Sequence, residues 1–403
     1  MKIKVLHILN RLIIGGPTIV ALNIINNLPD NFEVKLLVGE KDESEKSGHN
    51  ILESMPANII YIPTMRRSLN LINDVRAYRA IKKIIKEYKP DIIHTHASKA
   101  GAIGRLAASH VCVPVIIHTF HGHIFHSYFN KLITRAFIQT EKYLAKKSTK
   151  IIAISHSQKE ELAHTFNICN SEKITVIPNG INLEKFNENK IQKRTTFRNA
   201  INVINNETIL IGIVGRMVPV KNYSMFVDVI ELFLKKSTAK NVKFVIIGDG
   251  QTRKEIQSKL TNQQIKYNYL PENKNASDSR VIFTSWQAEM DMVFAGLDIV
   301  CLTSLNEGTP TSLIEAQAAS LPIVSTNVGG VADTVIENQT AFLTAPNDVN
   351  DFVAKLEILV NSVTKRKEMG EKGFVFVNEK YNHKRFINDT VNLYQDLYIN
   401  NKG

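Results

Sequence analysis

The sequence predicts an α/β protein of two domains, each built on a doubly wound parallel sheet with helices on both faces. Short runs rich in β-branched residues alternate with segments of helical periodicity, which is the pattern of successive βαβ units. The alternation stops at a polar stretch and then restarts, so each half predicts a sheet of its own. At 403 residues the chain is also too long for one ordinary core.

The first half begins with a strand and returns to strands at regular intervals. Apolar, β-branched runs predict strands over 5–9, 33–38, 59–63, 91–96, 114–120, 150–155 and 173–179. Helical spacing of apolar residues predicts helices over 18–27, 70–88 and 130–147. Parallel strands place their carboxyl ends at one edge of a sheet, so functional residues are expected in the loops that follow the strands.

The second half repeats the pattern after a polar stretch over 182–206, which is interpreted as a linker. Strands are predicted over 209–215, 243–250, 280–286, 298–304 and 321–327. The tail predicts a final helix with apolar Phe386, Val391, Leu393 and Leu397. The expected domains are 1–184 and 185–380, with 381–403 packing back toward the first domain. Two such sheets are expected to face each other across a ligand cleft.

Composition favours a folded protein of the cytoplasm. Hydrophobic residues make up 44% and charged residues 22% of the chain, which is typical of soluble globular proteins. Two long uncharged stretches, 12–29 and 106–130, contain glycine, proline, asparagine or histidine and do not predict membrane spans. The N-terminus lacks the features of a secretory signal, and three scattered cysteines form no disulfide framework.

The net charge of +12 is concentrated in the first half of the chain. Residues 1–190 contain 26 Lys and Arg against 16 Asp and Glu, whereas the remainder is nearly balanced. A one-sided basic surface attracts phosphates. The helix over 70–88 carries Arg76, Arg79, Lys82, Lys83 and Lys86, and is either a solvated basic face or a patch for anionic lipid or an acceptor's diphosphate. No nucleic-acid-binding module is present, so nucleic acid is not an expected partner.

Two carboxylates follow the predicted strand over 298–304. Glu307 lies in the loop after the strand, and Glu315 lies in a helix predicted to start with Thr309 as the N-cap and Pro310 as the first residue. One carboxylate can reach a sugar while the other accepts hydrogen bonds from a ribose diol. The free backbone amides near Thr309 to Ser312 can hold a diphosphate.

Two cations follow the predicted strand over 209–215. Arg216 and Lys221 project from a loop broken by Pro219, at the same sheet edge as the two carboxylates. They would neutralise a diphosphate without a metal. In the first half, Gly15 and Gly16 can be a flexible turn, a weak dinucleotide fingerprint or a tight phosphate-binding loop; the absence of G-x-G-x-x-G argues against the fingerprint.

The order and spacing of these motifs resemble glycosyltransferase family 4. The Glu-x7-Glu pair with Gly308, Pro310 and the downstream Gly329-Gly330 resembles that family's signature, and GRMVPVKN resembles its phosphate-binding segment. HTHASKAGAIGRLAA, FHGH and IPNGIN occur in family order, so the resemblance covers essentially the whole chain.

The resemblance implies the GT-B fold and transfer with retention of configuration, without a metal or other cofactor. It implies that Gly16 contacts the donor phosphate and that Arg216 and Lys221 bind the diphosphate. It also implies that His121 hydrogen-bonds the transferred sugar. The expected catalytic residues are Glu307, His121, Arg216 and Lys221, and the expected donor-binding residues are Gly16, Arg216, Lys221, Gly308, Thr309, Pro310, Thr311 and Glu315.

Four histidines crowd one segment of the first half: His118, His121, His123 and His126. Their spacing is compatible with a metal, but no cysteine or carboxylate completes a preferred ligand set, so no metal site is expected. Besides His121, these histidines are interpreted as structural or as acceptor contacts.

The predicted function is transfer of a hexose or N-acetylhexosamine from a nucleotide diphosphate sugar, with UDP favoured, to a glycan acceptor in bacterial surface polysaccharide synthesis. A polyprenyl-diphosphate acceptor and peripheral contact with the inner face of the membrane would explain the basic first half. The main alternative is a nucleotide-sugar 2-epimerase on the same scaffold. A two-lobed binding protein is disfavoured because it would normally carry an export signal and would need no converging Arg, Lys and paired Glu. A glycosidase is disfavoured because Glu307 and Glu315 are better placed to bind a donor.

Overall fold

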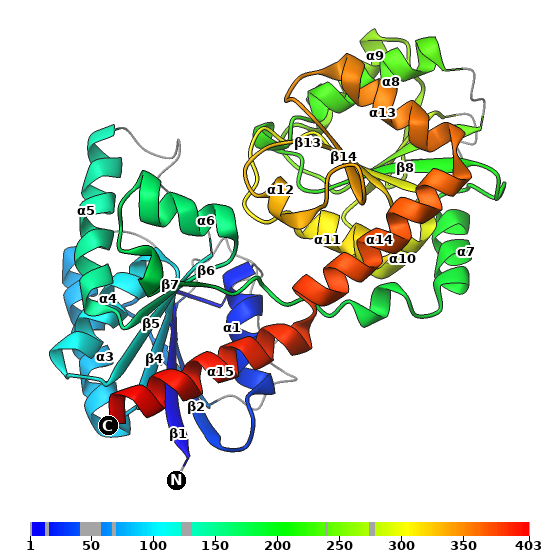
Figure 1. The fold of residues 1–403 in the computed structure, drawn as a ribbon. Helices are drawn as coiled ribbons and strands as arrows, with labels where there is room; N and C mark the ends of the chain where they lie inside the picture. Colours follow the sequence, from blue (N-terminus) through cyan, green and yellow to red (C-terminus); the bar gives the residue numbers. More distant parts are fainter. Residues whose placement is uncertain are drawn as a thin grey trace. The chain divides into compact units, whose positions relative to one another are not determined.

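A computed structural model describes residues 2–12, 16–40, 58–66, 70–121, 131–237, 241–273 and 279–402. The chain divides into two compact units (Figure 1). The first domain comprises Met1–Gly180 together with His383–Gly403, and the second comprises Ile181–Asn382.

The first domain contains a seven-stranded sheet in the order β3-β2-β1-β4-β5-β6-β7. All its described pairings are parallel. The strands are β1 (Ile3–Leu9), β2 (Phe32–Gly39), β3 (Asn58–Ile62), β4 (Ile92–His96), β5 (Val115–Phe120), β6 (Lys150–Ala153) and β7 (Ile174–Val176).

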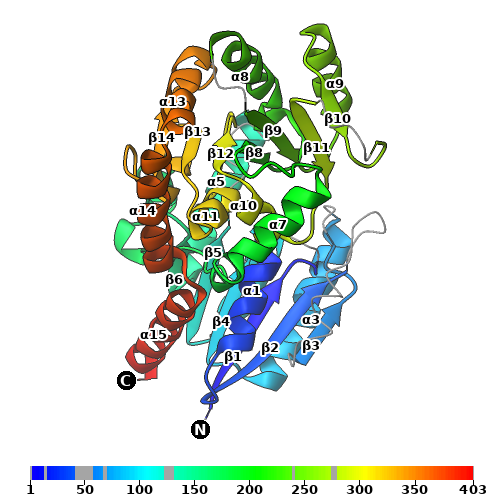
Figure 2. The same ribbon diagram turned by 90° about the vertical axis from the view of Figure 1, so that its right-hand side faces the viewer.

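Helices cover both faces of this sheet. They are α1 (Gly16–Asn27), α3 (Leu71–Tyr88), α4 (Ser98–His110), α5 (Lys131–Lys147), α6 (His156–Glu160) and α15 (His383–Lys402). α1 and α15 pack on one face through a core that includes Val20, Ile24 and Phe386, and both lie against the sheet in Figure 2. α3 and α4 pack on the opposite face. α15 therefore belongs to the first domain although it follows the second in the sequence.

The second domain repeats the architecture with the order β10-β11-β9-β8-β12-β13-β14, again in parallel. The strands are β8 (Ile209–Val214), β9 (Val242–Ile247), β10 (Tyr267–Tyr269), β11 (Val281–Ser285), β12 (Ile299–Leu302), β13 (Ile323–Thr326) and β14 (Ala341–Thr344). The helices are α7 (Lys190–Ala200), α8 (Tyr223–Lys236), α9 (Arg253–Asn262), α10 (Met290–Gly296), α11 (Thr311–Ala318), α12 (Val331–Thr334), α13 (Val349–Asn361) and α14 (Val363–Tyr381).

The polar stretch over 182–206 is not the predicted linker. Its centre forms helix α7, which buries Phe197 in the second core. Arg198 is also buried and donates to Asp298 at 2.6 Å and to the Thr208 carbonyl at 3.0 Å. The low apolar content of the stretch misled the prediction, because a buried arginine with carboxylate and carbonyl partners replaces apolar contacts here.

Helix α3 starts at Leu71, one residue after the predicted start, because Asn70 is its N-cap and accepts a hydrogen bond from the Asn73 amide at 3.0 Å. Its buried side chains are Ala77, Ile81, Ile85 and Tyr88. The first turn is different from a core-packed face, because Leu71 and Ile72 are largely exposed. In the part of the chain that the structure describes, no helix combines the length and apolar character needed to cross a bilayer.

Candidate active site

The candidate site of the second domain lies at the carboxyl ends of β8 and β12, two neighbouring strands that are not consecutive in sequence. The loops after them are tied together: the Leu305 amide donates to the Val220 carbonyl at 2.8 Å, and the Thr303 hydroxyl donates to the Asn222 carbonyl at 3.0 Å. In doubly wound sheets ligands bind at such a switch of strand order. Of the cations and carboxylates predicted from the sequence, Arg216, Lys221 and Glu307 lie in these two loops, whereas Glu315 lies in the helix that follows the second loop.

Lys221 and Glu307 form an ion pair in this site. The Lys221 Nζ lies 2.6 Å from Glu307 Oε1, and the Ser304 hydroxyl donates to the same oxygen at 2.5 Å. The side chains of Lys221 and Glu307 are 22% and 9% exposed, so both are held in place yet still reach solvent. Ser304, which sequence reasoning missed, fixes the carboxylate from the end of β12.

A third loop, after β13, packs against the backbone of Glu307. The Gly330 amide donates to the Glu307 carbonyl at 3.0 Å. A Cβ on Gly330 would lie 1.7 Å from the Gly308 carbonyl oxygen, and Gly329 adopts φ +50°. Only glycine fits both positions without moving the Glu307 loop.

Arg216 is not brought to the ion pair. The Arg216 side chain is exposed, and its guanidinium makes no hydrogen bond or ion pair with any residue that the structure describes. The backbone beside it is fixed, because the Met217 amide donates to the Asp249 carbonyl at 3.0 Å. Asp249 in turn binds Arg253 at 2.9 Å and Tyr269 at 3.1 Å. Asp249, inside the GDG sequence after β9, is a second residue that the sequence reasoning did not select.

Helix α11 begins at Thr311 rather than at Pro310, and Thr309 is not its N-cap. Pro310 occupies the cap position and makes no side-chain cap hydrogen bond. Gly308 and Thr311 are exposed, so the first backbone amides of the helix lie beside accessible positions. No side chain among the described residues hydrogen-bonds the Glu315 carboxyl, and burial raises its pKa to about 7, against a smaller opposing effect of Lys185.

In the first domain, His121 directly follows β5 and its Nε2 lies 3.0 Å from Nδ1 of His96. Burial lowers the pKa of His121 to about 4, so the ring is neutral. His118 is buried beside Thr95, with a ring nitrogen 2.9 Å from its hydroxyl. His123, His126 and Gly15 lie outside the described residues. Gly16 is the first residue of α1.

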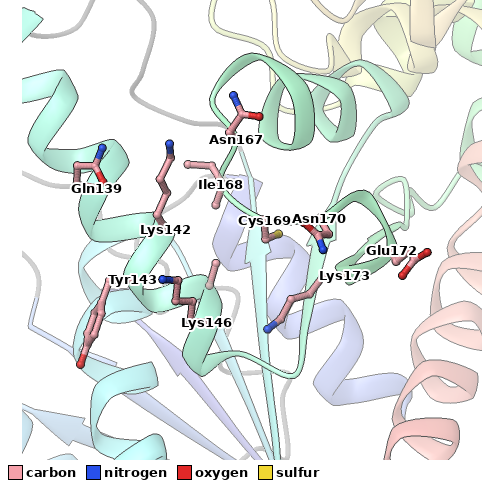
Figure 3. A pocket seen from close by; sticks show the side chains of 11 residues that line it. Gln139, Lys142, Tyr143, Lys146, Asn167, Ile168, Cys169, Asn170, Glu172 and Lys173 are labelled. Carbon is pink, nitrogen blue, oxygen red and sulfur yellow. The ribbon is translucent and has the colours of Figure 1, made fainter.

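A separate groove of about 620 Å³ lies between α5 and the segment that leads into β7 (Figure 3). It is lined by Lys142, Lys146 and Lys173 among other polar side chains. Lys146 precedes β6 and Lys173 directly precedes β7, so the groove lies at the amino ends of these strands. Ligands of doubly wound sheets bind at the carboxyl ends. The groove is therefore not the candidate active site.

Comparison with known families covers both domains. The Glycosyltransferase Family 4 model matches residues 14–185, and the model of glycosyl transferases group 1 matches residues 194–375. The chain is a glycosyltransferase. As a glycosyltransferase, it carries the Lys221–Glu307 pair in its group 1 domain and His121 in its family 4 domain.

Two bacterial relatives align with this glycosyltransferase over most of their length. The UDP-Gal:alpha-D-GlcNAc-diphosphoundecaprenol alpha-1,3-galactosyltransferase of Escherichia coli is 29% identical over 360 residues, 88% of this chain and 87% of that protein. The capsular polysaccharide biosynthesis glycosyltransferase CapM of Staphylococcus aureus is 26% identical over 363 residues, 87% of this chain and 89% of that protein.

Solved structures of glycosyltransferases share the fold. The Anabaena HepE structure in complex with UDP superimposes with a TM-score of 0.78 at 18% identity, over 98% of this chain and all of that chain. A glycosyltransferase from Rickettsia africae gives a TM-score of 0.79 at 17% identity, over 98% of each chain. These two-domain neighbours support the predicted GT-B architecture of parallel-sheet domains.

Proposed function

We propose that this glycosyltransferase transfers a hexose or N-acetylhexosamine from a UDP-sugar with retention of configuration and without a metal ion. The observation that carries the proposal is the Lys221–Glu307–Ser304 cluster at the carboxyl ends of β8 and β12. Next to it, the exposed start of α11 offers backbone amides, and Glu315 offers a carboxyl without a protein partner among the described residues. Cation, amides and carboxylates are the groups that a nucleoside diphosphate sugar requires.

The leaving group is stabilised by fixed charge in this proposal. Departure of a nucleoside diphosphate places negative charge on the β-phosphate, and Lys221, Arg216 and the first amides of α11 neutralise it. Exposed Arg216 is free to turn toward a bound phosphate. Because these groups supply the positive charge, the reaction does not require a divalent cation.

Glu307 and His121 are proposed to hold the transferred sugar. The carboxylate of Glu307 is oriented by Lys221 and Ser304, so it can accept hydrogen bonds from sugar hydroxyls and stabilise an oxocarbenium-like state. Glu315 accepts hydrogen bonds from the ribose hydroxyls. Gly16 at the start of α1 contacts the donor phosphate. The acceptor hydroxyl attacks from the face that the leaving group vacates, which retains the configuration.

The proposed acceptor is a glycan linked to a polyprenyl diphosphate. The Escherichia coli relative carries such an acceptor in its name, and a Campylobacter jejuni relative, 30% identical over 161 residues, is named for an undecaprenol-linked glycan. The basic excess of the first half of this chain suits a diphosphate acceptor.

The start of α3 is proposed to contact the anionic membrane that carries this acceptor. Leu71 and Ile72 are 80% and 66% exposed, and exposed Arg76 and Arg79 follow on the same helix. Apolar side chains beside cations bind a lipid interface. Sedimentation with anionic and with zwitterionic vesicles tests this contact, and Leu71→Ser with Ile72→Ser is expected to reduce binding to the anionic vesicles only.

A transfer assay tests the proposed function. UDP- and GDP-sugars labelled in the sugar are offered with a polyprenyl-diphosphate glycan, with and without EDTA. The expected result is EDTA-resistant transfer from one UDP-sugar, with an α-linked product from an α-linked donor by NMR. Loss of transfer in EDTA contradicts metal independence, and inversion contradicts retention. Release of an epimerised sugar without acceptor would establish the 2-epimerase alternative instead.

A further inference from the structure

Three histidines and a tyrosine meet inside the first domain, where the transferase reaction as proposed has no use for them. His7 on β1 and His94 on β4 are register partners, and His96 follows two residues along β4, so all three project from one face of the sheet. Tyr394 reaches them from α15. All four side chains are fully buried.

The four side chains form part of a continuous series of hydrogen bonds. Thr119 Oγ1 lies 2.7 Å from His94 Nε2, and His94 Nδ1 lies 2.5 Å from the Tyr394 hydroxyl. That hydroxyl lies 3.3 Å from His7 Nε2, and His7 Nδ1 lies 3.0 Å from His96 Nε2. The series ends at His121, whose Nε2 lies 3.0 Å from His96 Nδ1.

Burial keeps every ring in the series neutral. It lowers the pKa of His7 to about 3 and of His121 to about 4, and lowers the pKa values of His94 and His96 well below 6.5. It also raises the pKa of Tyr394, which keeps its proton. A neutral imidazole has one donor and one acceptor, so each hydrogen bond fixes the direction of the next.

Only one direction uses the hydroxyl hydrogen of Thr119. If Thr119 donates to His94, then His94 donates to Tyr394, Tyr394 to His7, His7 to His96 and His96 to His121. The opposite direction leaves the Thr119 hydrogen without an acceptor among the described residues. It also leaves His121 Nδ1 as a bare acceptor, because that buried atom has no hydrogen-bond partner there. The first direction leaves one unsatisfied group and the second leaves two, and each costs free energy.

We infer that these six side chains form one directed hydrogen-bond relay, which holds His121 as its Nδ1–H tautomer and makes Tyr394 and Thr119 positioning residues. His121 then presents a donor N–H, and a ligand oxygen is its natural partner. That this oxygen belongs to the transferred sugar rests on the proposed function, whereas the relay itself does not. Each histidine of the relay is expected as the Nδ1–H form, the minor form of a free neutral histidine.

A metal ion is the competing occupant of this cluster. His7, His94 and His96 each offer one nitrogen, and these atoms lie within 4.8 Å of one another. A divalent ion would break the hydrogen bond between His7 and His96, and no carboxylate of the group offsets its charge. The hydrogen bonds already account for both nitrogens of each of these three rings. The relay is therefore favoured over the metal.

Nitrogen NMR of the full chain with 15N-labelled histidine tests the relay. The expected spectrum of the unliganded protein shows His7, His94, His96 and His121 each as a single Nδ1–H tautomer. Tyr394→Phe and Thr119→Val each remove the group that sets the direction, so His121 is expected to lose its single-tautomer pattern although Tyr394 does not contact it. Tyr88→Phe is the matched control, because Tyr88 is a buried tyrosine of the same domain whose hydroxyl donates to the Glu33 carbonyl instead.

Three results would overturn the relay: an Nε2–H form of His121 in the unaltered protein, a His121 pattern that is the same in all three variants, or one equivalent of tightly bound metal by elemental analysis.

A binding assay tests the sugar contact separately. Tyr394→Phe is expected to weaken binding of the nucleotide sugar roughly 2- to 10-fold, the value of one hydrogen bond, and to leave binding of UDP unchanged. Equal loss of affinity for both ligands contradicts the sugar contact, and so does failure of every nucleotide sugar to bind. Neither outcome affects the relay, which the NMR experiment tests independently.

Discussion

Lys221 neutralises a protein carboxylate before any phosphate is bound, because its ammonium already lies 2.6 Å from Glu307. The two side chains therefore act as one unit. Lys221→Ala and Glu307→Gln are each expected to lower kcat at least about 100-fold, the scale of losing one charge-stabilising group. Their double variant is expected to be little worse than the poorer single one.

Steady-state kinetics of the three variants measures this coupling. Lys259→Ala is the matched control, because Lys259 forms an ion pair of the same 2.6 Å length with Asp228 between helices α8 and α9. The control should retain activity. Independent, multiplying losses in the double variant would show that Lys221 and Glu307 do not cooperate.

The buried carboxyl of Glu315 is expected to lower the stability of the folded protein at high pH while it contributes to binding of the donor. Its pKa is raised by burial to about 7, above the usual value of 4.5, so ionisation is harder in the folded state. The carboxyl's contribution to stability is fully present below pH 4.5 and is lost as the pH rises to about 7. Glu315→Gln should therefore raise the free energy of unfolding at pH 8 by on the order of 1 kcal/mol, with little gain at pH 4.5.

Urea unfolding at the two pH values measures the stability of Glu315→Gln, and UDP titration measures its binding. The variant is expected to bind UDP more weakly, because the amide replaces one carboxylate acceptor by a donor. If the variant is no more stable at pH 8 than the unaltered chain, burial of the Glu315 carboxyl does not destabilise the folded protein.

The individual residues differ in how well the sequence reveals them. Lys221 and Glu307 are polar residues just after strands, so their meeting could be predicted from the parallel-sheet pattern. Ser304 and Asp249 fall at the ends of the strands predicted over 298–304 and 243–250, and only the hydrogen bonds show their role. His7, His94 and His96 lie inside strands, and the sequence alone does not distinguish a histidine with a functional role from one that only packs in the core.

At the scale of elements, the loops after β8, β12 and β13 form one backbone-bonded layer. Gly330→Ala would place a Cβ 1.7 Å from the Gly308 carbonyl and push the Glu307 loop away from its position. Activity is expected to fall at least about 10-fold, because small displacements of catalytic groups are costly. The melting temperature should fall by only a few degrees, since the carbonyl that the Cβ would meet belongs to Gly308, which is exposed.

Kinetics and thermal unfolding of Gly330→Ala test this layer. Gly308→Ala is the control for folding alone, because a Cβ there meets no atom within 4 Å. Full activity of the Gly330 variant would show that the loop moves freely without harm to the site.

Most strands and the helices α1, α3, α5, α11 and α15 are predicted from the sequence, whereas the strands β10 and β14 and the helices α4, α7, α8, α13 and α14 are not among the predicted elements. β10 (YNY) and β14 (AFLT) contain no Val or Ile, whereas the equally short β7, β12 and β13 could be predicted from their Val and Ile residues. The start of α11 was misplaced by one residue because Pro310, which usually opens a helix, precedes it here. These elements therefore depend more on tertiary packing than on the local propensity of their residues.

At the scale of the whole molecule, the first domain depends on a helix that is distant in sequence. α15 buries Phe386, Ile387, Val391 and Tyr394 against the first domain. Removal of residues 383–403 is expected to abolish the thermal transition of the first domain and to preserve that of the second, whose cores contain none of these residues.

Differential scanning calorimetry of the truncated chain measures both transitions. Ile399→Ser is the control, because Ile399 lies on α15 but is 67% exposed, and both transitions should persist. Survival of the first transition in the truncated chain would show that the sheet of the first domain is stable without α15.

The return of α15 to the first domain also sets the order of events at the ribosome. Domains usually mature in the order in which they are translated. Here residues 383–402 are translated after the entire second domain, so the second domain can finish its core first. Until then, among the described helices, α1 alone covers that face of the first sheet, and the apolar surface that α15 buries stays exposed and accessible to a chaperone.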